Sequence, residues 1–306
     1  MIRRILCPID FSDTSEHCVA HAAALARWRQ ARLTVLYVES PLTQRLPHAT
    51  EEWTDAQAHQ SDSERIRRRV EALLTAAGEP PDRADVIVDL GQPVPRILER
   101  AAGLPADLIV MGTHGIGGVQ HLVLGSVAEK VLRRAPCDVL VVPPRALSAA
   151  RLPYASILCG VDFSDVSQRA LTVACELATD SGASLTVLHA IGWPWNESSE
   201  PDLTEVPAAQ AAALGEYRRY LETTAAARLR DLLTASPVRP AHDTALVRHG
   251  RSHRELLRAA REGDVDLIVL GAQGRGSVDL ALFGSTASQV VRGAACPVWI
   301  VRLPGR

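Results

Sequence analysis

Short apolar runs alternate with longer polar or amphipathic stretches along the first half of the chain. Apolar runs of about four to eight residues are typical of buried strands, and apolar residues spaced three or four apart predict helices. The pattern predicts strands over residues 3–9, 32–38, 84–90, 107–111 and 138–142, and helices over 13–30, 52–77, 91–102 and 126–134. Ser12-Asp13 offers a cap for the first helix, because Glu16 follows Asp13 by three residues as in a capping box.

The second half of the chain repeats this pattern. Residues 5–40 and 157–192 align without a gap at an offset of 152, and both contain Ile-Leu-Cys and Asp-Phe-Ser-Asp. The segments 107–112 and 266–271 align at an offset of 159. The difference of seven residues falls in the middle of each copy, where a surface insertion is tolerated best. The repeat therefore predicts two tandem domains, residues 1–146 and 152–306.

Strands and helices alternate in the order βαβαβαβαβ in each copy, and the second copy has a longer predicted helix at about 207–235. Continuous apolar strands that alternate with helices predict a parallel sheet covered on both faces. Right-handed crossovers leave few topologies for such a sheet. We therefore expect an α/β protein made of two doubly wound domains.

Composition excludes several classes of protein. Of the 306 residues 47% are hydrophobic and 22% charged, which suits a globular protein, and the net charge of -2 does not favour nucleic-acid binding. Lys130 is the only lysine, so no Gly-Lys-Ser/Thr triplet of a Walker-type phosphate loop exists. Six cysteines without a Cys-x-x-Cys pair predict buried free thiols. With no signal peptide or membrane span expected, we predict a cytoplasmic protein.

A glycine-rich loop follows the fourth predicted strand of each copy. The spacing Gly-x2-Gly-x9-Gly-Ser occurs at Gly112, Gly115 and Gly125-Ser126, and again at Gly271, Gly274 and Gly284-Ser285. Glycine lets a phosphate approach backbone N–H groups, and the N-terminus of the next helix attracts an anion. The alternative is a surface loop with an ordinary serine N-cap. The same spacing after the same strand in both copies favours phosphate binding.

Asp10 and Asp162 end the first strand of each copy. Ligands of open parallel sheets bind beyond the carboxyl ends of the strands, where the winding reverses. A carboxylate there is well placed to accept hydrogen bonds from a ribose or an amino group. The alternative is that both aspartates are turn residues before the Ser-Asp cap, and the sequence leaves both interpretations open.

Ile-Asp-Phe-Ser and Asp-Leu-Ile-Val-Met-Gly-Thr-His-Gly, followed by Gly-Ser at this spacing, resemble the universal stress protein family. The resemblance covers nearly the whole chain and looks like a tandem member of the ATP-binding branch. It implies five-stranded sheets ordered 3-2-1-4-5 and bound ATP, with Mg²⁺. Ala190 departs from the family's usual valine, and Gln273 stands where the first copy has His114.

The resemblance also implies which residues contact the nucleotide. Base and ribose contacts are expected at Asp10 and Val38 in the first copy and at Asp162 and Ala190 in the second, with Met111 and Leu270 lining the pockets. Phosphate contacts are expected at Gly112, Gly115, Gly125, Ser126 and Val127, and at Gly271, Gly274, Gly284, Ser285 and Thr286.

Three other features have simpler interpretations. His17 with His21, and His249 with His253, have a zinc-compatible spacing of four, but we interpret them as surface histidines since neither pair recurs in the other copy. The run 64–69 is interpreted as an exposed helix face. The fifth strands, 139–142 and 298–301, are apolar edges that the family implies are paired, here within the chain; a homodimer through these edges stays open.

The leading hypothesis is a nucleotide-dependent stress-response regulator with one ATP site per domain. We see no acidic metal pair beside the loop, and phosphoryl transfer needs strong charge neutralisation, so we expect slow or absent hydrolysis. The alternatives are a weak ATPase or autophosphorylating protein with Ser126 or Ser285 as acceptor, and a scaffold that works through an unknown protein partner.

Overall fold

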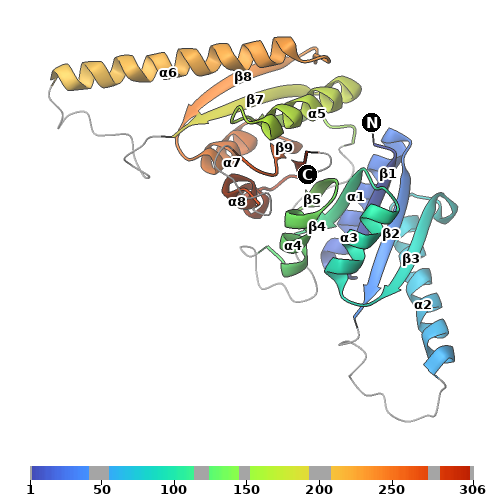
Figure 1. Cartoon of the computed structure of the whole chain (residues 1–306). Coiled ribbons are helices and arrows are strands. Elements are labelled where there is room, and N and C mark those ends of the chain that lie inside the picture. Colours follow the sequence, from blue (N-terminus) through green and yellow to red (C-terminus); the bar gives the residue numbers. More distant parts are fainter. Residues whose placement is uncertain are drawn as a thin grey trace.

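The computed structural model describes residues 2–40, 55–113, 124–144, 152–192, 208–274 and 283–303. Each half of the chain contains the predicted alternation (Figure 1). The first half comprises β1 (Arg4–Ile9), α1 (Asp13–Arg29), β2 (Arg32–Glu39), α2 (Asp55–Ala76), a 3-10 turn (Pro81–Arg83), β3 (Ala84–Leu90), α3 (Pro93–Gly103), β4 (Leu108–Gly112), α4 (Ser126–Arg134) and β5 (Asp138–Val142). The second comprises β6 (Ser156–Gly160), α5 (Asp165–Ser181), β7 (Ser184–Ile191), α6 (Ala208–Ala235), β8 (Asp243–His249), α7 (Ser252–Glu262), β9 (Leu267–Gly271), α8 (Ser285–Gly293) and β10 (Val298–Val301).

All ten strands belong to one sheet, ordered β3-β2-β1-β4-β5-β10-β9-β6-β7-β8. Neighbours within each half are parallel, which confirms the predicted doubly wound class and the order 3-2-1-4-5. The two halves meet through β5 and β10, which pair antiparallel with Leu140 opposite Trp299. The prediction that the apolar fifth strands pair within the chain is therefore confirmed, and each protects the other's edge.

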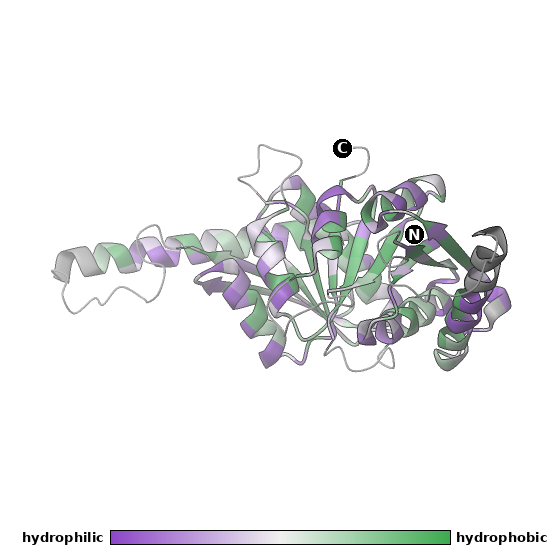
Figure 2. Cartoon of the chain, turned by 90° about the horizontal axis from the view of Figure 1, so that it is seen from below, coloured by the Kyte–Doolittle hydropathy of each residue, from purple (hydrophilic) through white to green (hydrophobic). Residues whose placement is uncertain are grey.

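Helices cover both faces of the sheet, and each face holds its own apolar core. Alternate strand residues point to opposite faces, so Ile5 and Cys7 lie in one cluster and Leu6 in the other. The first cluster takes its helical residues from α1, α2, α5 and α6, and the second from α3, α4, α7 and α8. The hydropathy colouring shows apolar strands between the two helix layers (Figure 2). In the same view α6 extends beyond the sheet.

The first helix begins differently from the sequence prediction. Ser12 is its N-cap residue, Asp13 is already helical, and no side chain caps the helix. The capping box of Asp13 and Glu16 is therefore wrong. The Ser12 hydroxyl instead donates to Asp10 Oδ1 at 2.6 Å, because the tight turn after β1 brings that carboxylate within reach.

Two side-chain groups join the halves on either side of the β5–β10 pair. Trp299 is 1% exposed, and its indole N–H donates to Asp138 Oδ2 at 3.2 Å. On the other side, His21 lies 3.0 Å from the Tyr154 hydroxyl, and Trp28 packs edge-on against the same tyrosine. His21 is only 4% exposed, so its interpretation as a surface histidine is wrong. Tertiary burial against the second domain explains the error.

Burial lowers the pKa of His21 from 6.5 to about 4. The folded protein therefore resists protonation of this ring more than the unfolded chain does, so the stabilisation is complete above about pH 6.5 and is lost as pH falls toward 4. We expect the free energy of unfolding to drop by about 2 kcal/mol between pH 7.5 and pH 5 from this group. Urea unfolding at several pH values measures the drop, and His21→Gln should flatten it.

His17→Gln is the matched control, since His17 is an exposed histidine one turn earlier on the same helix. It should leave the pH dependence of unfolding unchanged. An equal slope in the wild-type protein and in His21→Gln would contradict the assignment.

Among the described residues no helix is long and apolar enough to cross a membrane. Within the same part of the chain no three His, Cys, Asp or Glu side chains are grouped as metal ligands. The run of charged residues at 64–69 is exposed except for Ile66, which confirms the predicted helix face.

Candidate functional site

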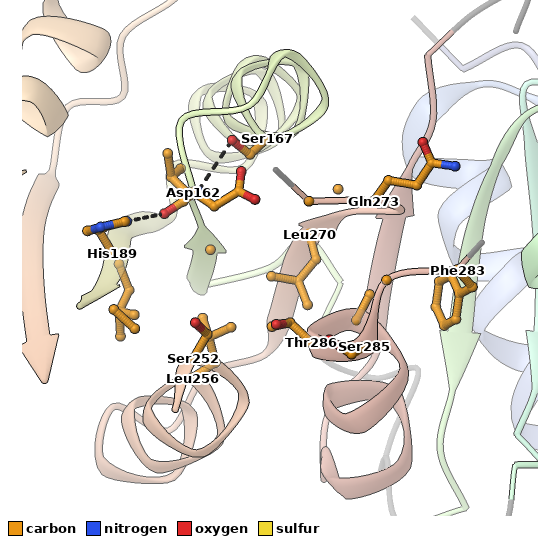
Figure 3. A pocket seen from close by; sticks show the side chains of 18 residues that line it. Asp162, Ser167, His189, Ser252, Leu256, Leu270, Gln273, Phe283, Ser285 and Thr286 are labelled. Carbon is orange, nitrogen blue, oxygen red and sulfur yellow. Dashed lines mark hydrogen bonds between the residues drawn. The ribbon is translucent and has the colours of Figure 1, made fainter. Parts of the chain in front are cut away.

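A cavity of about 570 Å³ opens at the carboxyl ends of the strands in the second domain (Figure 3). Its walls come from the ends of β6, β7 and β9 and from the first residues of α7 and α8. It therefore lies where the chain winds away from the centre of the sheet in both directions, the position at which open α/β sheets bind ligands. Its volume falls within the range of small-molecule sites.

The structure brings together all eight residues that the sequence indicated in the second copy. Each of them lines the one cavity, although they come from four separate segments of the chain. They are Asp162, Ala190, Leu270, Gly271, Gly274, Gly284, Ser285 and Thr286. Their role in holding a nucleotide stays a prediction.

The carboxylate of Asp162 has one oxygen in the local turn and one toward the glycine loop. Oδ1 accepts hydrogen bonds from the Ser164 backbone N–H at 3.0 Å and from its hydroxyl at 2.5 Å. A Cβ placed on Gly274 would lie 2.7 Å from Oδ2. Asp10 repeats the turn, with Oδ1 accepting from the Ser12 N–H at 3.0 Å. The turn role and the ligand role left open by the sequence are therefore compatible.

The two ends of each glycine loop are held together by the same backbone hydrogen bond. Gly125 N–H donates to Thr113 O at 2.8 Å, and Gly284 N–H donates to Ala272 O at 2.9 Å. Each of these glycines is the N-cap residue of the following helix, and Ser126 or Ser285 is the first helical residue. The alternative of an ordinary serine N-cap is therefore wrong, and each helix N-terminus faces the end of its strand without a capping side chain.

The predicted residues of the first copy occupy the matching places. Asp10 follows β1, Val38 lies near the end of β2, and Met111 with Gly112 ends β4. Gly125 precedes α4, and Ser126 and Val127 are its first two residues. A Cβ on Gly112 would lie 2.9 Å from the Thr14 hydroxyl, so the strand end packs tightly on α1. Gly115 lies outside the described residues.

The two copies differ beneath the predicted base site. Gly160 lines the cavity in the second domain, and a Cβ there would lie 2.5 Å from Leu270 Cδ2. Pro8 occupies the equivalent position in the first domain, where Met111 replaces Leu270. Leu270 therefore forms part of the floor of the second cavity, and its side chain fits there because residue 160 is a glycine.

The sequence interpretation missed an aromatic and arginine cluster beside each site. In the second domain His189 lies against Phe163 with ring centroids 4.5 Å apart, and Arg228 lies 4.3 Å from the Phe163 ring. In the first domain Tyr37 and Arg69 contact Phe11 at 4.9 and 4.1 Å. Both phenylalanines have a positive φ, 60° and 65°. The offsets of 152 and 159 relate every member of the two clusters, so both domains repeat this arrangement.

Further wall residues come from α7, which the sequence did not connect with the site. Ser252 and Leu256 face the cavity from its first turns (Figure 3). His189 also lines it, with Nδ1 2.7 Å from Val161 O. Because α7 begins at the carboxyl end of β8, the rule that placed Asp162 would have found these residues too.

All six cysteines are free, and four of them are buried. The buried ones are Cys7, Cys18, Cys159 and Cys175. Burial raises the pKa of Cys7 to about 12 and that of Cys18 well above its usual value. Protonated, desolvated thiols of this kind are inert, which confirms the prediction of buried free thiols for these four.

The chain is therefore a tandem protein of two doubly wound α/β domains. Its second domain has a cavity of small-molecule size beside the N-terminus of the helix that follows the glycine loop. A family model described as the universal stress protein family matches residues 1–143 and again residues 153–302. The chain belongs to the universal stress protein family, with two family domains in tandem. The limits 1–146 and 152–306 stay a prediction.

Individual relatives agree with this assignment. A universal stress protein of Mycobacterium tuberculosis is 29% identical over 304 residues, which is 97% of this chain and 96% of the relative. A second one from the same species is 30% identical over 210 residues; that match covers 69% of this chain and 66% of the relative, just under two thirds of its length. The crystal structure of a universal stress protein from Archaeoglobus fulgidus has a TM-score of 0.64 at 22% identity and 98% coverage of both chains, which supports the fold.

Proposed function

We propose that each domain of this chain binds one ATP molecule, with Mg²⁺, and that nucleotide binding regulates its action in a stress response. The observation that carries the proposal is the repeated geometry at the strand ends. In both domains an aspartate follows the first strand, and a backbone hydrogen bond closes the glycine loop onto a helix N-terminus. Geometry kept in both copies favours a shared ligand.

The residues present suit the parts of a nucleotide. Apolar side chains of Leu188, Leu256 and Leu270 give the cavity an apolar wall for a base. Asp162 Oδ2 is the oxygen we assign to the ribose hydroxyls. The backbone N–H groups at the start of α8 form an anion site, because a helix N-terminus has unpaired donors and a positive dipole end.

The glycines fit this assignment for a steric reason. A Cβ on Gly284 would lie 3.2 Å from Ala272 O, and one on Gly271 would lie 2.9 Å from Val166 Cγ1. A side chain at Gly284 would crowd the backbone just after β9, and one at Gly271 would crowd the first turn of α5. Mg²⁺ supplies charge neutralisation when it is bound, and it usually retains waters while coordinating substrate phosphates. Phosphate oxygens are therefore its expected main ligands here.

Calorimetric titration of ATP with Mg²⁺ into the folded chain, freed of carried-over nucleotide, tests the proposal. We expect saturable binding at two sites per chain. AMP should bind more weakly because it lacks the β- and γ-phosphates, and GTP because it lacks the adenine base. Following the same samples for phosphate release separates binding from weak hydrolysis. A folded, nucleotide-free chain that shows no heat of binding would overturn the proposal and favour the scaffold.

A further inference from the structure

A second cavity, of about 360 Å³, lies at the junction of the two domains and away from the proposed nucleotide sites. It borders the amino ends of β4 and β5, whereas the nucleotide sites lie at the carboxyl ends. One helix face of α5 forms a wall through Arg169, Thr172, Val173 and Glu176. The end of α1 and the segment after β10 complete it, so both domains contribute.

The internal repeat shows that this space is not a necessary consequence of the fold. The offset of 152 pairs Ile2 and Val173 of this cavity with Tyr154 and His21. On that other side of the β5–β10 pair, the buried Tyr154 ring and its contact with His21 occupy the space. Smaller aliphatic side chains leave the cavity open on this side, which distinguishes one half of the interface from the other.

Three guanidinium groups line the open cavity. The Arg29 side chain is only 10% exposed, and it forms an ion pair with Asp180. Arg302 donates to Leu132 O at 2.7 Å and to Arg133 O at 3.2 Å, both carbonyls at the end of α4. Arg169 Nε donates to Arg302 O at 2.7 Å. Two of the three cations therefore make their hydrogen bonds to carbonyl oxygens, which carry no net charge.

Three carboxylates also border the cavity, and two of them are engaged elsewhere. Asp107 Oδ2 accepts from the backbone N–H groups of Arg3 and Arg4, at 2.7 and 2.9 Å. Asp138 accepts from the Trp299 indole and from the Arg302 backbone N–H. Glu176 is the third carboxylate. The oxygens of Asp107 and Asp138 thus accept from backbone and indole N–H groups, and the negative charge of Asp138 balances part of the charge of Arg169 and Arg302.

We propose that this interdomain cavity binds a small oxyanion, a phosphate or carboxylate group held by Arg29, Arg169 and Arg302. The planar guanidinium offers paired N–H donors that match the oxygens of either group, and the partial burial of Arg29 and Arg302 strengthens such charge-assisted bonds. Because Arg302 also binds the last carbonyls of α4, an anion here contacts the helix whose first turn belongs to the nucleotide site of the first domain.

Titration with inorganic phosphate, and separately with malonate, tests the proposal. The full chain is used with Gly125→Val and Gly284→Val, so that the glycine loops do not contribute phosphate binding. We expect saturable binding of at least one of the two anions, at one site per chain. Phosphate binding alone identifies a tetrahedral ligand, and malonate binding identifies a carboxylate, both within the proposed class.

Two further variants locate the site. Arg169→Gln should weaken binding about tenfold, the loss of one charge-assisted contact. Arg230→Gln is its matched control, since Arg230 is also an exposed helical arginine whose Nε donates to a backbone carbonyl. Val173→Phe should remove binding by filling the cavity without changing charge. The proposal would be overturned if the parent protein showed no saturable binding. It would also be overturned if Arg169→Gln and Val173→Phe both bound the anion as tightly as the parent protein does.

Discussion

Gly274→Val is expected to reduce ATP binding from two sites per chain to one. The surviving site belongs to the first domain, which the substitution does not touch. Affinity at the second site should fall at least hundredfold, equivalent to about 2.7 kcal/mol or more. Calorimetric stoichiometry measures the change directly.

The physical reason is the contact between Gly274 and Asp162. The first side-chain carbon would already lie 2.7 Å from Asp162 Oδ2, closer than carbon and oxygen can approach. The carboxylate has little freedom to move away, because Ser164 holds Oδ1 through two hydrogen bonds. The substitution must therefore displace either the aspartate or the glycine loop, and the proposed nucleotide site needs both in place.

Gly215→Val is the matched control for this experiment. A Cβ on Gly215 meets no atom within 4 Å, and the residue lies on the long helix α6 away from the cavity. It should retain two sites with unchanged affinity. If Gly274→Val kept two ATP sites of wild-type affinity, the second ATP molecule would bind at another part of the chain.

The internal repeat explains why so much of the fold could be predicted. Strands β3 and β5 and helix α4 have the predicted limits, because short apolar runs between helices leave one consistent arrangement. Pairing of β5 with β10 was implied by the family resemblance, and the structure confirms it within the chain, whereas the apolar edges alone left a homodimer open. The error at Asp13 arose because a capping box is a local pattern, whereas Ser12 is drawn toward Asp10 by the turn after β1.

Tertiary contacts explain what the sequence did not provide. The burial of His21 depends on Tyr154, its hydroxyl partner 133 residues away on the other domain. The wall that Ser252 and Leu256 contribute could have been predicted, because α7 also begins at the carboxyl end of a strand. The glycine positions could be predicted because their spacing is repeated. The difference between Gly160 and Pro8 was visible in the sequence, but its meaning required the Leu270 side chain beside it.

The seam between the two domains, meaning the β5–β10 pair and the side chains packed on it, is asymmetric. Asp138 on β5 corresponds to Pro297 in the second copy, and Trp299 corresponds to Leu140 in the first. The indole–carboxylate hydrogen bond therefore forms once at the pseudo-symmetric interface, between β5 of one domain and β10 of the other. Two copies of the first domain meeting through β5 would lack the tryptophan. The contact thus favours pairing of unlike domains.

Trp299→Ala is expected to lower the free energy of unfolding by about 3–5 kcal/mol, the usual cost of deleting a buried large aromatic side chain. Among the residues that the structure describes, Trp299 is the largest fully buried side chain, and it lies at the seam where the two halves of the sheet join. Its loss also leaves Asp138, which is 9% exposed, without the indole donor. Urea unfolding followed by far-ultraviolet circular dichroism measures the change without relying on tryptophan fluorescence.

Trp299→Phe separates packing from hydrogen bonding in this prediction. The phenyl ring keeps much of the apolar contact but has no N–H for Asp138, so the expected loss is about 1–3 kcal/mol. Asp138→Asn keeps an acceptor for the indole and removes the charge, and it should cost less than Trp299→Ala. A loss below about 1 kcal/mol in Trp299→Ala, less than a typical core truncation, would mean that the seam contributes little to folding. We expect the loss of 3–5 kcal/mol because, among the described strands, β5 and β10 are the pair that joins the two halves of the sheet.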